Sequence, residues 1–301
     1  MPSRFGRYLP TRARSCLMLL SSFVAPVSLL DAQVPKPGPT IKVYKTVGGV
    51  KLTAHVFWPD GAGQVARRPA IILLHGGGWT DGDPEWCYDN AKRYAGLGLV
   101  AIAGEYRLSD RKTTTPLEAM ADVRDLVRWV RDNASELGVD SHRVAVDGIS
   151  AGGHLAAAAA VFAHPEESKT SAVPDALILL SPAVAIAGDP WPRLLLGSRS
   201  DVKAISPADN IEKPLPPVLM MEGTADTETP LAGAQRFCDR AIQVGGTCEI
   251  HLFPGVGHLL TRNLDPHAQE EGPFDPAPEA LKETYAEEAA FLLRIGFMKQ
   301  P

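Results

Sequence analysis

The chain has 301 residues, enough for one large domain or two small ones, and its hydrophobic content of 45% is ordinary for a soluble globular protein. The net charge is −5 and basic blocks are absent, which argues against a nucleic-acid partner. Beyond the N-terminus, no apolar stretch approaches the roughly 20 residues of a membrane-spanning helix, so no stable membrane anchor is expected.

The N-terminus has the layout of a secretory signal peptide. Four arginines, at positions 4, 7, 12 and 14, precede the apolar stretch Cys16 to Leu30. We expect cleavage near Ala32, which makes residues 1–32 a removed leader, residues 33–40 a proline-rich tether and residues 41–301 the folded domain. The expected location is therefore secreted or periplasmic.

Removal of the leader leaves three cysteines, Cys87, Cys238 and Cys248, in an oxidising compartment. Cys238 lies late on an expected helix and Cys248 at the start of the next expected strand, with a glycine turn between them. This placement allows either a Cys238–Cys248 disulfide or two separately buried thiols. Cys87 is then a free thiol.

The pattern of the remaining chain predicts one α/β domain. Two β-rich runs, 41–47 and 51–58, meet at a glycine pair and predict an antiparallel leading hairpin. Apolar strands that alternate with amphipathic helices then predict a mostly parallel central sheet flanked by helices. The expected strands are 70–74, 99–103, 144–146, 176–180, 217–221 and 249–253, and the expected helices are 86–97, 117–137, 151–163, 231–244 and 278–295.

Residues 181–217 contain several prolines and little periodicity. They predict a small irregular insertion over the carboxyl edge of the sheet. The sequence leaves open whether this insertion moves as a lid.

The sharpest motif is G-x-S-x-G at residues 148–152, between an expected strand and an alanine-rich helix. In this context the motif predicts a strained turn that lifts the Ser150 hydroxyl above the sheet, near a helix N-terminus that favours developing negative charge. We interpret Ser150 as a nucleophile. A turn that merely joins strand to helix is the alternative interpretation.

A serine hydroxyl needs a base to take its proton, and His258 is the best placed histidine. It ends the segment PGVGH, directly after the expected strand 249–253. The carboxylate that orients the base should follow a strand and lie between serine and histidine in the chain. Asp226 meets both conditions. Glu228 is a close rival, and a mere cap of the following helix is the alternative role for Asp226.

The segment HGGGW at residues 75–79 follows another expected strand. Adjacent glycines let backbone N–H groups approach a reacting oxyanion without side-chain interference. The expected donors are Gly77, Gly78 and Ala151, and Gly76 is able to replace one of the glycines. A plain turn or a phosphate cradle is the weaker alternative, because no G-x-G-x-x-G or G-K-[ST] follows. The histidines are explained without a metal, His154 as a packed or capping residue, and no cofactor is expected.

These motifs, together with Glu105 to Leu108 and Gly223 to Asp226, make the sequence similar to the α/β-hydrolase superfamily. It resembles the hormone-sensitive-lipase-like and acetyl-esterase-like branch, especially the bacterial group related to bifunctional feruloyl and acetyl-xylan esterases, the BD-FAE-like hydrolases. The resemblance covers nearly the whole chain after the leader. It implies the α/β-hydrolase fold, and the same triad and oxyanion donors as the motifs. Ile149 and Glu222 depart from the usual pattern.

The resemblance implies a serine ester hydrolase with an acyl-enzyme mechanism. The chain lacks a long N-terminal cap, which suits bulky or polymeric esters, and the expected substrates are short-acyl or aryl esters, including acetyl or feruloyl esters of plant polysaccharides. Amide cleavage, as in formamidases of the same fold, is an alternative. A non-catalytic binding protein of this fold is another, although all three triad residues are present. Acyl and alcohol specificity and oligomeric state are left open.

Overall fold

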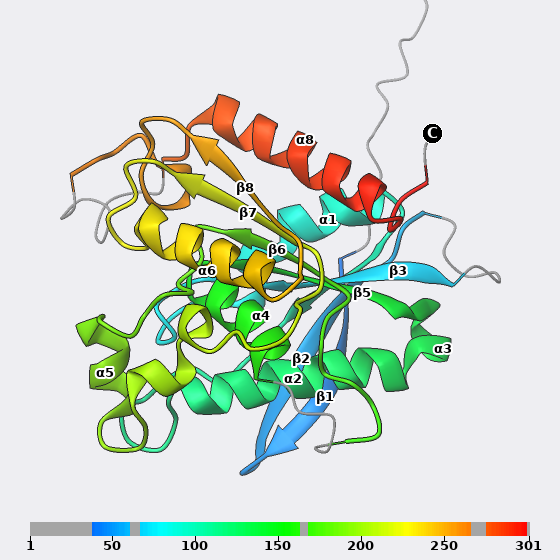
Figure 1. The fold of residues 1–301 in the computed structure, drawn as a ribbon. Helices are drawn as coiled ribbons and strands as arrows, with labels where there is room; N and C mark the ends of the chain where they lie inside the picture. Colours follow the sequence, from blue (N-terminus) through cyan, green and yellow to red (C-terminus); the bar gives the residue numbers. More distant parts are fainter. Residues whose placement is uncertain (1–37, 61–66, 163–167, 266–274, 300–301) are drawn as a thin grey trace, which may run out of the picture. The chain divides into compact units, whose positions relative to one another are not determined.

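The computed structural model describes residues 38–60, 67–162, 168–265 and 275–299. These residues form an eight-stranded sheet with the order β1-β2-β4-β3-β5-β6-β7-β8 (Figure 1). The leading strands β1, β2 and β4 pair antiparallel, and the pairs from β4–β3 to β7–β8 are parallel. The predicted α/β-hydrolase architecture is confirmed. The strands are β1 Thr40–Val47, β2 Val50–Phe57, β3 Arg68–Leu74, β4 Val100–Gly104, β5 Val139–Ile149, β6 Ala176–Leu180, β7 Val218–Gly223 and β8 Cys248–Phe253.

Helices cover both faces of this sheet. The helices α2, α4 and α6 lie on one face, and α1 and α8 lie on the other (Figure 1). The helical segments are η1 Pro84–Cys87, α1 Tyr88–Gly96, α2 Pro116–Asp132, α3 Ala134–Leu137, α4 Ala151–Val161, α5 Pro190–Leu196, η3 Val202–Ile205, η4 Pro207–Asp209, α6 Leu231–Gln243, η5 His258–Leu260 and α8 Pro278–Arg294.

The core consists of two apolar layers separated by the sheet. In β5, Val144 and Val146 join the layer under α2 and α4, whereas Ala145 joins the layer under α1 and α8. Every residue of β6 is buried. Because both faces are covered, the central strands are continuously apolar rather than alternating, as their sequences indicate.

The helix expected over residues 117–137 is two helices in the structure. α2 begins with a capping box in which Thr115 and Glu118 satisfy each other's backbone N–H groups. It ends at Asn133, whose side chain donates to the carbonyl of Trp129 and whose φ and ψ are −100° and 17°. An asparagine amide competes with helical hydrogen bonding, so the chain breaks there before α3.

The insertion 181–217 is more regular than expected. Asp189 accepts a hydrogen bond from the N–H of Trp191 and caps α5, and Asp201 caps η3 in the same way. These helical segments are too short to produce a periodic pattern in the sequence. The small irregular insertion that the sequence predicts thus contains three short helical segments, α5, η3 and η4.

The expected leader, residues 1–32, and residues 33–37 of the tether lie outside the described residues. Within the parts of the chain that the structure describes, helices long and apolar enough to cross a membrane are absent.

Candidate active site

Ser150 occupies a strained turn between β5 and α4. Its φ and ψ are 54° and −116°, a conformation that residues with a side chain rarely adopt. A Cβ at Gly148 would lie 2.4 Å from the carbonyl oxygen of Gly152, and a Cβ at Gly152 would lie 2.3 Å from the carbonyl oxygen of Leu74. Both glycines of the motif are therefore required by close backbone contacts.

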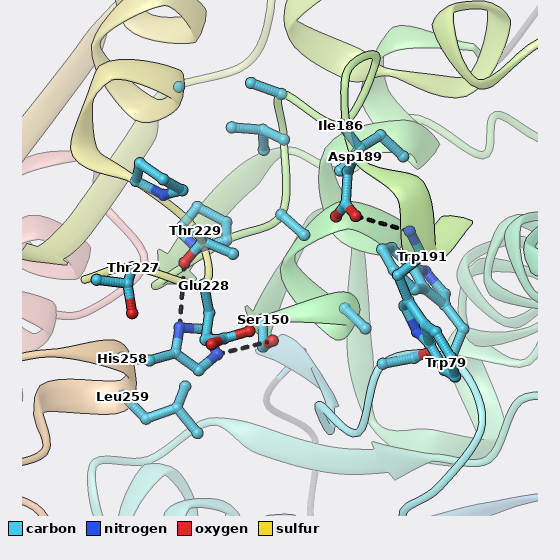
Figure 2. A pocket seen from close by; sticks show the side chains of 18 of the residues that line it. Trp79, Ser150, Ile186, Asp189, Trp191, Thr227, Glu228, Thr229, His258 and Leu259 are labelled. Carbon is cyan, nitrogen blue, oxygen red and sulfur yellow. Dashed lines mark hydrogen bonds between the residues drawn. The ribbon is translucent and has the colours of Figure 1, made fainter. Parts of the chain in front are cut away.

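His258 connects the serine to a carboxylate. Its Nε2 lies 3.0 Å from the Ser150 hydroxyl oxygen, and its Nδ1 lies 2.8 Å from Oδ2 of Asp226. Figure 2 shows the imidazole between Ser150 and Thr229. A carboxylate accepts from Nδ1–H, which leaves Nε2 as the acceptor for the serine proton. The arrangement is that of a nucleophile, a base and an orienting acid.

The Asp226 side chain is wholly buried. Its Oδ1 accepts from the backbone N–H groups of Glu228 and Thr229, and the Thr229 hydroxyl donates to Oδ2 at 2.9 Å. Burial raises the pKa of Asp226, but the hydrogen bonds from His258 and Thr229 outweigh it, so this pKa lies below the usual value for aspartate. The rival carboxylate, Glu228, is exposed in the cavity wall instead.

Sequence reasoning missed two supporting residues. The hydroxyl of Thr229 lies within 3.1 Å of both the Ser181 carbonyl oxygen and His258 Nδ1. Ser181 is fully buried at the end of β6, and its hydroxyl accepts from the N–H of Leu259 at 3.1 Å. Thr229 could have been predicted from its position three residues after Asp226, because a threonine hydroxyl at that spacing can form a hydrogen bond with the aspartate side chain. Ser181 carries no local signal.

The loop His75–Trp79 lies beside the nucleophile. Gly77 and Gly78 have φ of 100° and 56°, and a Cβ at Gly77 would lie 2.2 Å from the carbonyl oxygen of Asp81. Thr80 and Asp81 donate to the Gly77 carbonyl at 3.0 Å, which fixes the Gly78 N–H on the opposite side of that peptide. The Gly76 carbonyl accepts from His75 Nδ1 at 2.7 Å and so fixes the Gly77 N–H in the same way. The buried Tyr106 hydroxyl donates to the His75 carbonyl at 2.8 Å and lies 3.2 Å from the Gly76 carbonyl.

The N–H groups of Gly77, Gly78 and Ala151 have no acceptor within the described ranges, and all three residues line the cavity with Ser150. The alternative donor, Gly76, is not in the cavity wall, and a Cβ there would meet the Ser150 Cβ at 3.2 Å. The geometry therefore favours Gly77 and Gly78 over Gly76 as oxyanion donors.

The cavity around Ser150 measures about 1130 Å³. One wall comes from the insertion, at residues 182–186 and 189–191, and another from the acid loop at residues 227–230. Figure 2 shows Trp79 and Trp191 on the side of Ser150 away from Thr227. Trp86 also lines the cavity and is 61% exposed, so the mouth offers an aromatic surface to a substrate.

Glu222, next to the acid loop, is a buried acid without hydrogen-bond partners among the described residues. It is completely inaccessible to solvent. Burial, followed by the charge of Asp226, raises the pKa of Glu222 to about 10. Glu222 is therefore a neutral carboxylic acid at neutral pH, which avoids a second negative charge beside Asp226.

Cys238 on α6 and Cys248 on β8 form a disulfide, with their Cα atoms 5.2 Å apart. Cys87 is a buried free thiol. Within the described part of the chain, groups of three or more histidine, cysteine, aspartate or glutamate side chains arranged to hold a metal ion are absent.

Comparisons with known proteins identify the family of this chain. Residues 56–176 match the BD-FAE family model. Thermogutta terrifontis esterase 2 with bound propionate is 32% identical, with a TM-score of 0.75, over 89% of this chain and 98% of that chain. The chain belongs to the α/β-hydrolase serine esterases of the BD-FAE type. As a member of this family it is a carboxylic ester hydrolase.

The same Thermogutta terrifontis protein phosphorylated by paraoxon is 32% identical to this esterase, with a TM-score of 0.76, over 88% of this chain and 97% of that chain. Among curated proteins, esterase LipC of Mycobacterium tuberculosis is 28% identical over 215 residues, which are 63% of this esterase and 52% of LipC. The esterase thus spans about half the length of this curated relative, and less of several others.

Proposed function

We propose that this esterase cleaves short-acyl or aryl esters in two steps. Ser150 attacks the ester carbonyl while His258 takes its proton, and the alcohol leaves with that proton. Water then attacks the resulting acyl-enzyme, again with His258 as base, and releases the acid and free Ser150. Asp226 keeps the proton of His258 on Nδ1, and Gly77, Gly78 and Ala151 stabilise the oxyanion in both steps.

The proposal rests on two contacts of His258. Its Nε2 lies 3.0 Å from the Ser150 hydroxyl oxygen, and its Nδ1 lies 2.8 Å from Oδ2 of Asp226. Both distances lie within hydrogen-bonding reach, which proton transfer requires. The Thermogutta terrifontis structures add support, since that protein was solved phosphorylated by paraoxon and with propionate or butyrate bound.

For the alcohol, we propose a ring-bearing group such as a sugar of a plant polysaccharide carrying acetyl or feruloyl esters. The support is the large cavity and the exposed Trp86 at its mouth, because exposed tryptophans stack against rings at low entropic cost. The expected effect of Trp86→Ala is a raised KM for an acetylated xylo-oligosaccharide and an unchanged KM for ethyl acetate. Equal effects on both would count against a ring site there.

The test of the reaction itself is hydrolysis of acetyl, butyryl, octanoyl and feruloyl esters by the wild type and Ser150→Ala. Loss of the nucleophile should lower kcat by about 10⁴- to 10⁶-fold. Ser135→Ala, at an exposed position on α3, is the matched control and should keep full activity.

Paraoxon labelling provides a second measurement that is independent of the natural substrate. Mass spectrometry should find one diethylphosphoryl group on Ser150 in the wild type and none in Ser150→Ala. Cleavage of amides in preference to every ester would favour the formamidase-like alternative, and absence of both turnover and labelling would favour a binding protein.

We also propose that the protein is exported and that its leader, residues 1–32, is removed. The support is the run of arginines followed by an apolar segment. Sequencing the N-terminus of the protein recovered from the periplasm or medium of a bacterial host should give a chain that starts near Gln33. Recovery only of intact chain in the cytoplasm would contradict this proposal.

A further inference from the structure

Trp79, the last residue of the oxyanion loop, has an unfavourable backbone conformation. Its φ is 62°, directly after the positive φ of Gly77 and Gly78. Residues with a side chain hold such a conformation only where their surroundings enforce it. Trp79 as a whole is only 2% exposed, so the restraint must come from the protein interior.

The indole contacts one polar partner among the described residues, the imidazole of His154. Trp79 Nε1 lies 3.3 Å from His154 Nδ1, and the two rings meet edge-on with centroids 5.2 Å apart. His154 belongs to α4, four residues after Ser150, and is completely buried. A side chain of the nucleophile's own helix therefore contacts the residue that ends the oxyanion loop.

The second ring nitrogen of His154 fixes its proton. Nε2 lies 2.8 Å from the carbonyl oxygen of Ile205 in η3, part of the insertion. An indole nitrogen can only donate and a carbonyl can only accept, so Nδ1 must be the acceptor and Nε2–H the donor. Burial lowers the pKa of His154 to about 4, which keeps this neutral tautomer at neutral pH.

We propose that His154 is a positioning residue for the oxyanion hole. It restrains Trp79 and thereby holds the N–H groups of Gly77 and Gly78 toward the oxygen of the reacting ester. This role rests on the proposed esterase mechanism and adds a residue outside the triad and the oxyanion donors. It differs from ordinary core packing because the hydrogen bond to Trp79 is required, and not only the volume of the ring.

Two substitutions of His154 distinguish a required hydrogen bond to Trp79 from simple packing of the ring. In His154→Asn the amide oxygen replaces Nδ1 and can still accept from Trp79, whereas in His154→Gln the amide nitrogen replaces Nε2 and keeps only the bond to Ile205. We expect His154→Gln and Trp79→Phe to lower kcat by about 10- to 100-fold, less than the 10²- to 10³-fold loss of an oxyanion donor. His154→Asn should stay within about threefold of wild type.

The readout that packing alone would not change is the affinity of a trifluoromethyl ketone, which forms a tetrahedral oxyanion on Ser150. For His154→Gln and Trp79→Phe, this affinity should fall in parallel with kcat while KM for the ester stays constant. Equal losses for His154→Asn and His154→Gln, or a lowered thermal midpoint with unchanged kcat, would overturn the proposal.

A measurement on the wild type keeps the proposal testable if these variants do not fold. Nitrogen NMR of histidine-labelled protein should show an unprotonated Nδ1 and a protonated Nε2 for His154, and the Trp79 indole signal should shift when the trifluoromethyl ketone binds. A protonated Nδ1, or an indole signal that stays in place, would contradict it. Failure of the esterase mechanism would appear separately, as wild-type protein without turnover or labelling by paraoxon.

Discussion

The indole N–H of Trp191 donates a 2.9 Å hydrogen bond to the carbonyl oxygen of Gly78. Trp191 lies on α5 of the insertion, and Gly78 lies in the oxyanion loop after β3. A Cβ at Gly78 would meet the same indole nitrogen at 3.1 Å, so the tryptophan lies directly against the loop. The wall of the cavity thus supports a residue that we propose as an oxyanion donor.

Replacement of Trp191 by phenylalanine keeps the ring and removes this hydrogen bond. We expect a fall in kcat of about 3- to 10-fold, since one hydrogen bond contributes about 1 kcal/mol. Steady-state kinetics with a small acetyl ester would measure it. Trp129→Phe, on α2 beneath the sheet, is the matched control and should keep wild-type kcat. An unchanged kcat in Trp191→Phe would show that Gly78 holds its conformation without the indole.

Asp226→Asn tests the orienting acid. The variant removes the charge that fixes the proton on Nδ1 of His258, and we expect kcat to fall by about 10³- to 10⁴-fold with little change in KM. Glu228→Gln is the comparison, because it keeps the backbone N–H with which Glu228 donates to Asp226 and changes only the carboxylate. A larger loss in Glu228→Gln than in Asp226→Asn would assign the acid to Glu228.

Glu222→Gln should stabilise the fold increasingly as pH rises. The pKa of Glu222 is raised from 4.5 to about 10 in the folded protein, so the folded state favours the protonated acid. The contribution of protonated Glu222 to the free energy of unfolding is fully present below pH 4.5, and it is lost progressively as pH rises toward 10. Glutamine stays neutral, and its advantage should grow by roughly 1 kcal/mol per pH unit between pH 5 and 9.

Urea unfolding of wild type and Glu222→Gln at pH 5, 7 and 9 would measure this trend. Glu212→Gln, at an exposed position before β7, is the control and should show a small, constant difference. A stability difference for Glu222→Gln that does not vary with pH would mean that Glu222 titrates at its ordinary pKa.

Removal of the Cys238–Cys248 disulfide should destabilise the protein by roughly 2–3 kcal/mol, because the bond restricts the unfolded chain. The double variant Cys238→Ser, Cys248→Ser should unfold at lower urea concentration than oxidised wild type. Reduced wild type should behave like the variant. Equal midpoints for oxidised and reduced protein would show that the bond does not form in solution.

The sequence predicted the sheet and the approximate position of each catalytic candidate because these features have local signals. The apolar run 176–180 coincides with β6, and Ser150, Asp226 and His258 each follow a strand in the structure as they do in the sequence pattern. Parallel strands place their carboxyl ends at one edge of the sheet. Strand order in the chain was therefore enough to expect these three side chains near one another.

The supporting contacts could not be predicted in the same way. Trp191 meets Gly78 across 113 residues, and His154 meets Trp79 across 75. Each contact forms only when the insertion and the loop His75–Trp79 pack against the folded sheet. No sequence motif at Trp191 or His154 indicates which residue it will contact. Sequence reasoning assigned His154 to packing or capping, and the hydrogen bonds of its two ring nitrogens emerge only from the fold.

Trp191 both lines the cavity and donates a hydrogen bond to Gly78, which has a practical consequence for directed evolution of this esterase. Residues 182–186 and 189–191 shape the cavity, so libraries that seek new substrates would naturally vary them. Variation that includes Trp191 would also loosen Gly78, and improved selectivity would be selected together with slower turnover. Libraries that keep Trp191 constant and vary its neighbours would allow the two properties to evolve independently.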